Sequence, residues 1–319
     1  EEVDPVWGNP CLDKRLMEIW SSNKSCSQLP DFLVLGPQKT GTTALYTFLG
    51  LHPSIRHNVP SPHTFEEVQF FSGNNYYRGL DWYLKVFPSR ESAELMFEKS
   101  ATYFDSDLAP KRVKAMLPNT KLVVLLLAPE KRAYSWYQHQ VAHKLPAAVE
   151  NSFSRVLRSI HDPNAPKAIT DLRARCLHPS EYVRHLQRWM SLFPVSQLHV
   201  IDGDLLKTHP VTVMTDLQAF LGVHPVLDYS NFIRFNPRKG FYCQVTRGGS
   251  STSCLGRSKG KRYPPMAPED EAYLKDYFAP HNARLAQLLQ EQNMPLPSWL
   301  HSSTPSQEQH DLDAVGAGF

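Results

Sequence analysis

Long apolar runs are missing from this sequence. A membrane-spanning helix needs roughly 18 or more consecutive apolar residues, and no such run occurs in the 319-residue chain. The sequence therefore predicts no membrane span. The chain begins at Glu1 without a methionine or a signal-like segment, a pattern expected of a domain excised from a longer protein.

A strong net charge is missing as well. The 34 basic and 31 acidic residues leave a formal charge of +3, which is too small to indicate nucleic-acid binding by bulk charge. We expect no nucleic-acid partner. Apolar residues make up 41% of the chain, which is enough for a sizeable core.

Cysteine is scarce, and its spacing argues against zinc. None of the five cysteines forms a C-x-x-C pair. Cys11 and Cys26 flank a polar stretch, whereas Cys243 and Cys254 bracket a segment rich in glycine, serine and threonine. We expect two local disulfides with Cys176 free, and hence an oxidising compartment. The tripeptide Asn23-Lys-Ser has the form of a glycosylation acceptor, which agrees with a luminal location.

The stretch 36–43, Gly-Pro-Gln-Lys-Thr-Gly-Thr-Thr, is the most informative part of the chain. The apolar run 31–35 before it predicts a buried strand, and the periodicity of 42–49 predicts a helix that ends at Gly50. In a strand–loop–helix unit of this kind, backbone N–H groups and the helix N-terminus present partial positive charge to an anion. The sequence therefore predicts a P-loop-like phosphate-binding unit.

Two departures separate this loop from that of a nucleotide hydrolase or kinase. The spacing from Gly36 to Gly41 is kept, but the lysine, Lys39, lies inside the loop instead of following the second glycine. The next strongly apolar run, 121–127, lacks the aspartate that would hold Mg²⁺. These features favour transfer of a sulfuryl group without a metal. A P-loop kinase is the alternative that they leave open.

Apolar runs and helical periodicity alternate along the rest of the chain. Further strands are expected at 95–98, 121–127 and 197–202. Helices are expected at 81–87, 107–117, 130–144, 180–193, 210–221 and 268–292. Residues 51–64 and the basic region 234–265 are expected to be irregular, and 145–178 to combine loop and amphipathic helix.

This alternation predicts an α/β fold, a single domain whose central parallel sheet is flanked by helices and carries its ligand at the carboxyl ends of the strands. The domain is expected to cover 31–300. Residues 1–30 would form an N-terminal segment pinned by the first cysteine pair, and 301–319 a disordered tail.

Five motifs occur in the order typical of a known family: Gly36–Thr43, Thr64–Phe71, Phe97–Phe104, Arg132–His139 and Cys254–Gly260. Over about residues 11–299 the chain resembles the sulfotransferase domain of the bifunctional heparan sulfate N-deacetylase/N-sulfotransferases. The resemblance implies a sulfotransferase fold, the donor 3′-phosphoadenosine 5′-phosphosulfate and the free glucosamine amine of heparan sulfate as acceptor. It also implies a preceding membrane anchor and N-deacetylase domain, and thus the Golgi lumen as part of a type II membrane protein.

The resemblance assigns most of the donor site. Lys39 would stabilise charge on the leaving oxygen, and Ser135 and Arg132 would bind the 3′-phosphate. The wider superfamily usually has an arginine where this chain has Leu127, so a structural role for Arg132 stays open. Phe241 would contact the adenine, with Gln38 near the substrate. The other expected donor contacts are Thr40, Gly41, Thr42, Thr43, Lys259, Gly260 and Lys261.

The resemblance makes Glu67 the base that removes a proton from the acceptor amine. Because Glu66 and Glu67 are adjacent, on an extended segment their side chains would point to opposite sides. Glu66 would then contact the sugar. The alternative is that both are surface glutamates on a loop, without a role in the reaction.

His139 and His143 are four residues apart and should share a helix face. This is also a two-histidine zinc spacing, but no third ligand and no H-E-x-x-H pattern accompany it, so no metal is expected. The resemblance places His139 at the sulfuryl oxygens and His143 on the substrate. Structural histidines are the alternative.

Three functional alternatives remain beside N-sulfation of heparan sulfate or heparosan. They are an O-sulfotransferase on the same fold, a P-loop kinase, and a non-catalytic polysaccharide-binding module. A basic rim is expected to hold the polymer and to release it in salt. The rim residues are Arg238, Lys239, Arg247, Lys261 and Arg262.

Overall fold

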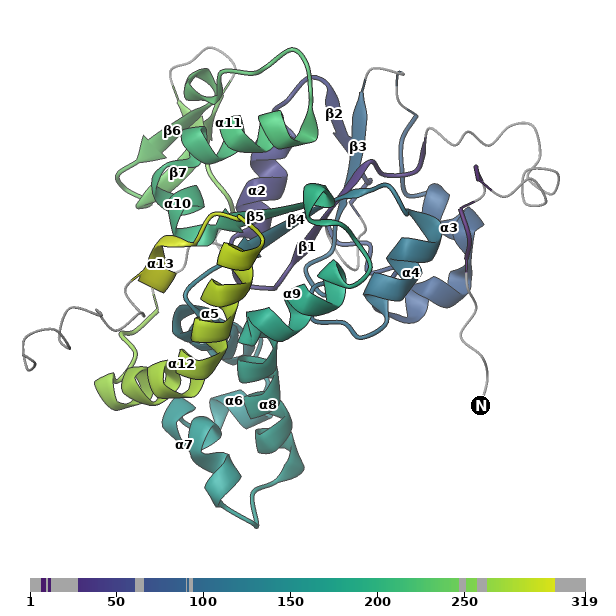
Figure 1. Cartoon of the computed structure of the whole chain (residues 1–319). Coiled ribbons are helices and arrows are strands. Elements are labelled where there is room, and N and C mark those ends of the chain that lie inside the picture. Colours follow the sequence, from purple (N-terminus) through teal and green to yellow (C-terminus); the bar gives the residue numbers. More distant parts are fainter. Residues whose placement is uncertain are drawn as a thin grey trace, which may run out of the picture.

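The computed structural model describes residues 7–9, 11–12, 28–60, 66–89, 91, 94–246, 251–256 and 263–301. Its centre is a five-stranded parallel sheet of order β2-β3-β1-β4-β5 (Figure 1). The strands are β1 Phe32–Gly36, β2 Ile55–His57, β3 Leu95–Lys99, β4 Lys121–Leu126 and β5 Leu198–Asp202. The four strands expected from apolar runs are confirmed. The short edge strand β2 lies within 51–64, which was expected to be irregular. The sequence has no strand signal there, because β2 has three residues and only the first is buried.

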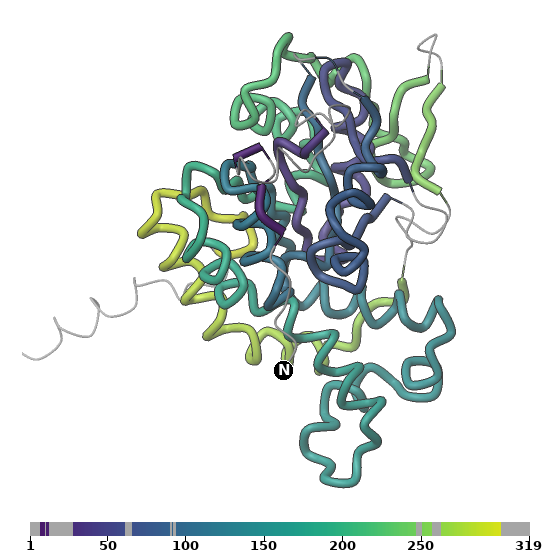
Figure 2. The backbone as a smooth tube through the Cα atoms, turned by 90° about the vertical axis from the view of Figure 1, so that its right-hand side faces the viewer, coloured from purple at the N-terminus to yellow at the C-terminus, as the bar shows by residue number. Residues whose placement is uncertain are grey.

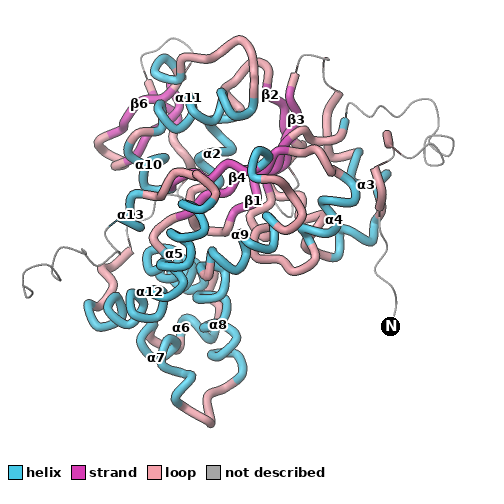
Figure 3. Tube along the Cα trace, viewed as in Figure 1, coloured by secondary structure: helices cyan, strands magenta, loops and turns pink. Residues whose placement is uncertain are grey.

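Strand β4 shows why the sheet is apolar on both faces. Leu122, Val124 and Leu126 face one layer of helices, whereas Val123 and Leu125 face the other. Parallel sheets covered on both sides read as nearly continuous apolar runs for this reason. In Figure 3 the central strands β1 and β4 lie among helices.

One face packs against α3 Leu80–Leu84, α4 Ala109–Met116, α9 Tyr182–Met190 and the second half of α12 Pro268–Glu291. The opposite face packs against α2 Thr42–Leu49, α10 Gly203–Thr208 and α11 Pro210–Leu221. All of these helices except α10 were expected. Helix α10 is too short to give a periodic signal and follows β5 directly.

A second group of helices has its own core. It contains α5 Pro129–Ala142, α6 Pro146–Val149, α7 Phe153–Arg158, α8 Lys167–Leu177 and the first half of α12. This group projects from the sheet-bearing body (Figures 1 and 2). A short helix, α13 Ser298–His301, follows α12. Short 3₁₀ helices occur at Asn74–Arg78, Ser159–His161, His178–Ser180, Val195–Gln197 and Tyr229–Asn231.

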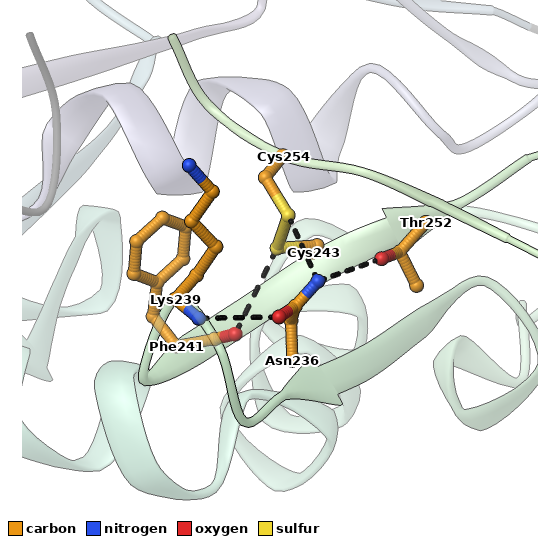
Figure 4. Close-up of a disulfide and its surroundings, with 6 residues drawn as sticks. All are labelled: Asn236, Lys239, Phe241, Cys243, Thr252 and Cys254. Atoms are coloured by element: carbon orange, nitrogen blue, oxygen red, sulfur yellow. Dashed lines mark hydrogen bonds between the residues drawn. A yellow bond between two sulfur atoms is a disulfide. The ribbon is translucent and has the colours of Figure 1, made fainter. Parts of the chain in front are cut away.

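The expectation of an irregular 234–265 region is wrong in part. The antiparallel strands β6 Ile233–Asn236, β7 Phe241–Val245 and β8 Thr252–Ser253 form a second sheet. A disulfide joins Cys243 to Cys254, and the Asn236 amide donates to Thr252 and Cys254 (Figure 4). These strands are short and only partly buried, so the sequence gives them a weak signal.

The disulfide expected at Cys243 and Cys254 is confirmed, and Cys176 is free and buried. Cys11 is disulfide-bonded; its expected partner Cys26, together with Asn23 and the tail from residue 302, lies outside the described residues. Among the helices that the structure describes, none combines the length and apolar character needed to cross a membrane.

Two close approaches fix the loop between β1 and α2. Gly36 has a φ of 101°, and a Cβ at this position would lie 2.4 Å from the Ala101 carbonyl oxygen. At the start of α10, a Cβ on Gly203 would lie 2.8 Å from the Thr40 carbonyl oxygen. The backbone on both sides of the loop is therefore too close for any side chain, and the loop has little room to move.

This crowding predicts a large cost for Gly36→Ala. The substitution has two costs: alanine would have to adopt a positive φ, and its Cβ would clash with the backbone of Ala101. We therefore expect the free energy of unfolding to fall by about 2 kcal/mol or more. Denaturant unfolding checks the value. The control is Gly50→Ala at the end of α2, where φ is −66° and the nearest atom lies 3.5 Å away; it should change stability by about 0.5 kcal/mol or less. Equal losses would contradict the prediction.

Candidate active site

The loop between β1 and α2 has the geometry of an anion site. Lys39 and Gly41 both have positive φ, 75° and 109°. Backbone of this kind occurs in anion-binding nests. Helix α2 begins at Thr42, and its N-cap Gly41 has no side chain that could cap the first N–H groups. The predicted strand–loop–helix unit is confirmed, and its helix terminus is open to an anion in the way that phosphate sites require.

The Arg132 side chain of α5 hydrogen-bonds to the backbone of this loop. Its Nε donates to the Gln38 carbonyl oxygen at 2.9 Å, and its Nη1 donates to the Cys176 carbonyl oxygen and the Ser180 hydroxyl. The residue is only 1% exposed, and burial lowers the pKa of its guanidinium. These contacts favour the structural alternative for Arg132 over the expected contact with a 3′-phosphate.

The threonines of the loop and of the first turn of α2 have different partners. Thr40 and Thr42 are buried, and the Thr40 hydroxyl donates to the Pro37 carbonyl oxygen at 2.8 Å. The Thr43 hydroxyl donates to Glu66 Oε1 at 2.7 Å. Thr43 thus joins the anion loop directly to the expected base segment.

Glu66 and Glu67 converge on one buried lysine. Lys99 Nζ lies 2.9 Å from Glu66 Oε1 and 3.0 Å from Glu67 Oε1, and Lys99 is 1% exposed. The expectation that the two carboxylates point to opposite sides is wrong, because Glu66 lies in a turn and not in an extended strand. Gln69, with a φ of 51°, also donates its amide to Glu67 Oε2 at 3.2 Å.

The Glu66 carboxylate is held in its ionised form. Burial raises its pKa, but the charge of Lys99 and the hydrogen bonds from Lys99 and Thr43 outweigh burial and leave the pKa at about 2. A carboxylate with so low a pKa is a weak base. Glu66 is therefore suited to binding and not to accepting a proton near neutral pH.

Sequence reasoning missed Lys99. A charged pair, Glu98-Lys99, ends the otherwise apolar strand β3. Polar residues at the carboxyl end of a buried parallel strand are the signal that could have found it, because ligands bind at that edge of the sheet. From the sequence alone, Lys99 could equally be a solvent-exposed residue at the end of the strand. The structure excludes this, because its side chain is buried.

The remaining expected residues lie on other elements. His139 lies on α5 and His143 is the C-cap residue of that helix; their ring centroids are 4.2 Å apart, so the two side chains are adjacent as predicted. Ser135 was expected near the start of this helix; it is the seventh residue of α5, in the second turn, and is half-buried. Phe241 begins β7 and is half-buried. Lys259, Gly260, Lys261, Arg247 and Arg262 lie outside the described residues.

Among the residues that the structure describes, no group of three or more His, Cys, Asp or Glu side chains could hold a metal ion. An anion loop at the carboxyl edge of a parallel sheet, next to ionisable side chains, is typical of enzymes that transfer a group from a nucleotide. The fold and the site define a protein of this class.

Comparison with known proteins identifies the family. Residues 29–294 match the family described as "Sulfotransferase domain", so the chain belongs to the sulfotransferases. It is 52% identical to the bifunctional heparan sulfate N-deacetylase/N-sulfotransferase of Drosophila melanogaster, over 94% of this chain and 30% of the relative. It is also 52% identical to form 4 of Mus musculus and 51% identical to form 3 of Homo sapiens, in each case over 94% of this chain and 34% of the relative.

The chain therefore spans about a third of the length of these relatives. Among solved structures, a sulfotransferase from Alicyclobacillus acidocaldarius has the same fold. The two superpose with a TM-score of 0.61 at 24% identity, over 85% of this chain and 98% of the other. The expected sulfotransferase fold is confirmed.

The depressed pKa of Glu66 predicts an acid-dependent stability. Its folded pKa of about 2 lies below the ordinary 4.5, so the pair with Lys99 stabilises the protein above about pH 5, and this contribution is lost as the pH falls toward about 2. In Glu66→Gln the free energy of unfolding should fall less between about pH 5 and about pH 3 than in the wild type.

Denaturant unfolding at several pH values checks this prediction. The control is Glu271→Gln, which breaks an exposed i,i+4 pair with Lys275. Exposed pairs contribute little to stability, so this variant should keep the wild-type acid dependence. The same acid dependence in Glu66→Gln as in the wild type would show that the Lys99 contact does not act in solution.

Proposed function

We propose that this chain is an N-sulfotransferase domain. It would move a sulfuryl group from 3′-phosphoadenosine 5′-phosphosulfate to the free glucosamine amine of heparan sulfate or its heparosan precursor. The name of the bifunctional relatives supports the acceptor, and the family supports sulfuryl transfer. The observation that carries the proposal is the carboxylate pair on Lys99, which Thr43 ties to the anion loop.

The proposed reaction is a displacement at sulfur. The amine nitrogen forms the new N–S bond while the bond from sulfur to the bridging phosphate oxygen breaks, and that oxygen leaves with the nucleotide. The Glu67 carboxylate takes the proton that the amine must lose. Lys39, within the anion loop, stabilises the negative charge that develops on the leaving oxygen.

Glu67 is a better candidate for the base than Glu66. Glu66 Oε1 accepts hydrogen bonds from both Thr43 and Lys99, and the pKa of this carboxylate is about 2. Glu67 accepts one hydrogen bond from Lys99 and one from the neutral amide of Gln69. Glu66 would instead keep the pair anionic, which attracts the cationic form of an amine.

The other parts of the donor and acceptor sites follow from the family motifs. Ser135 would bind the 3′-phosphate, Phe241 the adenine, and Lys259 the phosphosulfate. His139 would contact the sulfuryl oxygens, with His143 on the polysaccharide. An N-deacetylase domain in the rest of the parent chain would supply free amines, consistent with the bifunctional names of the relatives.

We place the protein in the Golgi lumen, attached to the membrane through a segment outside this chain. The disulfide between Cys243 and Cys254 supports this location, because disulfides persist in oxidising compartments.

The base assignment predicts unequal effects of two neighbouring substitutions. Glu67→Gln should lower the rate of sulfate transfer to de-N-acetylated heparosan by roughly 100-fold or more, the range typical of general-base catalysis. Glu66→Gln should cost less, because it alters the pair without removing the base. The affinity for 3′-phosphoadenosine 5′-phosphate, measured by calorimetry, should be unchanged in Glu67→Gln.

Fully N-acetylated heparosan is the control acceptor and should receive no sulfate. Transfer to this polymer would indicate an O-sulfotransferase, and full activity of Glu67→Gln would remove Glu67 from the mechanism. If the wild type binds heparin but transfers no sulfate to any acceptor, the chain is a non-catalytic polysaccharide-binding module.

A further inference from the structure

The carboxylate near the end of β3, Glu98, has no role in the reaction described above. It is completely buried. Its Oε1 accepts hydrogen bonds from the hydroxyls of Ser100 and Tyr103, and its Oε2 accepts one from the Tyr83 hydroxyl. Burial raises the pKa of Glu98 to about 7, and the three hydroxyl donors oppose that rise. Burying a carboxylate without hydrogen-bond partners would destabilise the fold, and here three hydroxyl donors satisfy it.

Two of these hydroxyls also hold the segment that follows Glu67. The Ser100 Oγ accepts the backbone N–H of Gln69 at 2.8 Å. The Tyr103 hydroxyl accepts the backbone N–H groups of Phe70 at 2.8 Å and Phe71 at 3.2 Å. Three consecutive N–H groups therefore bind to hydroxyls whose own protons are directed to Glu98.

The segment needs this support because it contains a strained residue. Gln69 has a φ of 51°, which costs energy for a residue that has a Cβ and persists only where the surroundings enforce it. The same Gln69 donates its side-chain amide to Glu67. A change in the backbone at Gln69 would therefore displace a direct partner of Glu67.

Glu98 and Lys99 act on the same segment from opposite faces of the sheet. Successive side chains of a strand alternate between faces. Glu98 meets Tyr83 and Tyr103 of the core that contains α3. Lys99 lies on the other side, over the ring of Tyr46 of α2, and holds the two carboxylates.

We propose that Glu98 is a positioning residue for the sulfuryl-transfer reaction, acting through Ser100 and Tyr103 to hold Gln69 and thereby Glu67 in place. This inference rests on the proposed function, in which Glu67 is the base. It does not require Glu98 to touch the substrate. Misplacement of a reacting group by about 1 Å can lower a rate 100-fold, so an anchor of this kind should affect turnover strongly.

Two tyrosines provide a matched test. Tyr83 and Tyr103 are both fully buried, and each donates one hydroxyl hydrogen bond to Glu98. Only the Tyr103 hydroxyl also binds the backbone of the segment. Tyr103→Phe should lower kcat for transfer to de-N-acetylated heparosan by about 10-fold or more, with the KM for the polymer and the affinity for 3′-phosphoadenosine 5′-phosphate unchanged. Tyr83→Phe should keep kcat within about 2-fold of the wild type.

Ser100→Ala provides a second variant in case Tyr103→Phe does not fold. It removes the link to Gln69 together with the Ser100 hydrogen bond to Glu98, and leaves the Tyr103 contacts with Phe70 and Phe71 in place. It should also lower kcat without changing the KM. Hydrogen exchange of the Gln69, Phe70 and Phe71 amides tests the anchor independently of activity. Exchange at Phe70 and Phe71 should be faster in Tyr103→Phe than in Tyr83→Phe.

The outcomes separate this inference from the proposed function. A wild type that transfers no sulfate would overturn the proposed function and the role of Glu98 with it. An active wild type with equal kcat values in Tyr83→Phe and Tyr103→Phe would overturn only the role of Glu98. Equal exchange rates of the segment amides in these two variants would do the same.

Discussion

The contact of the Lys99 ammonium with two carboxylates is the interaction on which the candidate site depends. Removing a lysine and two glutamates from water is expensive, and their attraction compensates only when the geometry is good and the remaining groups are hydrogen-bonded. Here Thr43 and Gln69 provide those further hydrogen bonds. The cluster has more carboxylates than ammonium groups, which suits an acceptor that arrives as a cation and must lose a proton.

The same cluster couples the two halves of the proposed reaction. Thr43 belongs to the helix that follows the anion loop, and Glu66 belongs to the segment that would meet the acceptor. The loop in turn rests on Arg132 of α5 and on the close approach of Gly36 to Ala101. The groups proposed to bind donor and acceptor thus belong to one connected set of contacts, which is what a preorganised site requires.

Much of the fold could be predicted from the sequence because its signals are local. The apolar runs of β1, β3, β4 and β5, the periodicity of α11 and the glycine spacing of the loop each lie within a few consecutive residues. The roles of Glu66 and Glu67 were predicted from the resemblance to a family and not from such signals, because the residues alone also fit two surface glutamates on a loop. The convergence of their carboxylates could not be predicted, because it depends on Lys99, which lies 33 and 32 positions further along the chain.

By itself, the sequence determined the parallel α/β architecture, the strand–loop–helix unit at 36–43 and the cysteine pair at 243 and 254. Only the tertiary structure decided that both carboxylates meet Lys99, that Arg132 donates to the Gln38 carbonyl oxygen of the loop, and that Ser100 and Tyr103 bind the segment after Glu67. The physical reason is separation along the chain: these contacts join residues about 30 to 90 positions apart. Local propensity carries no information about them, because burial and the alternation of β3 between two faces decide which side chains meet.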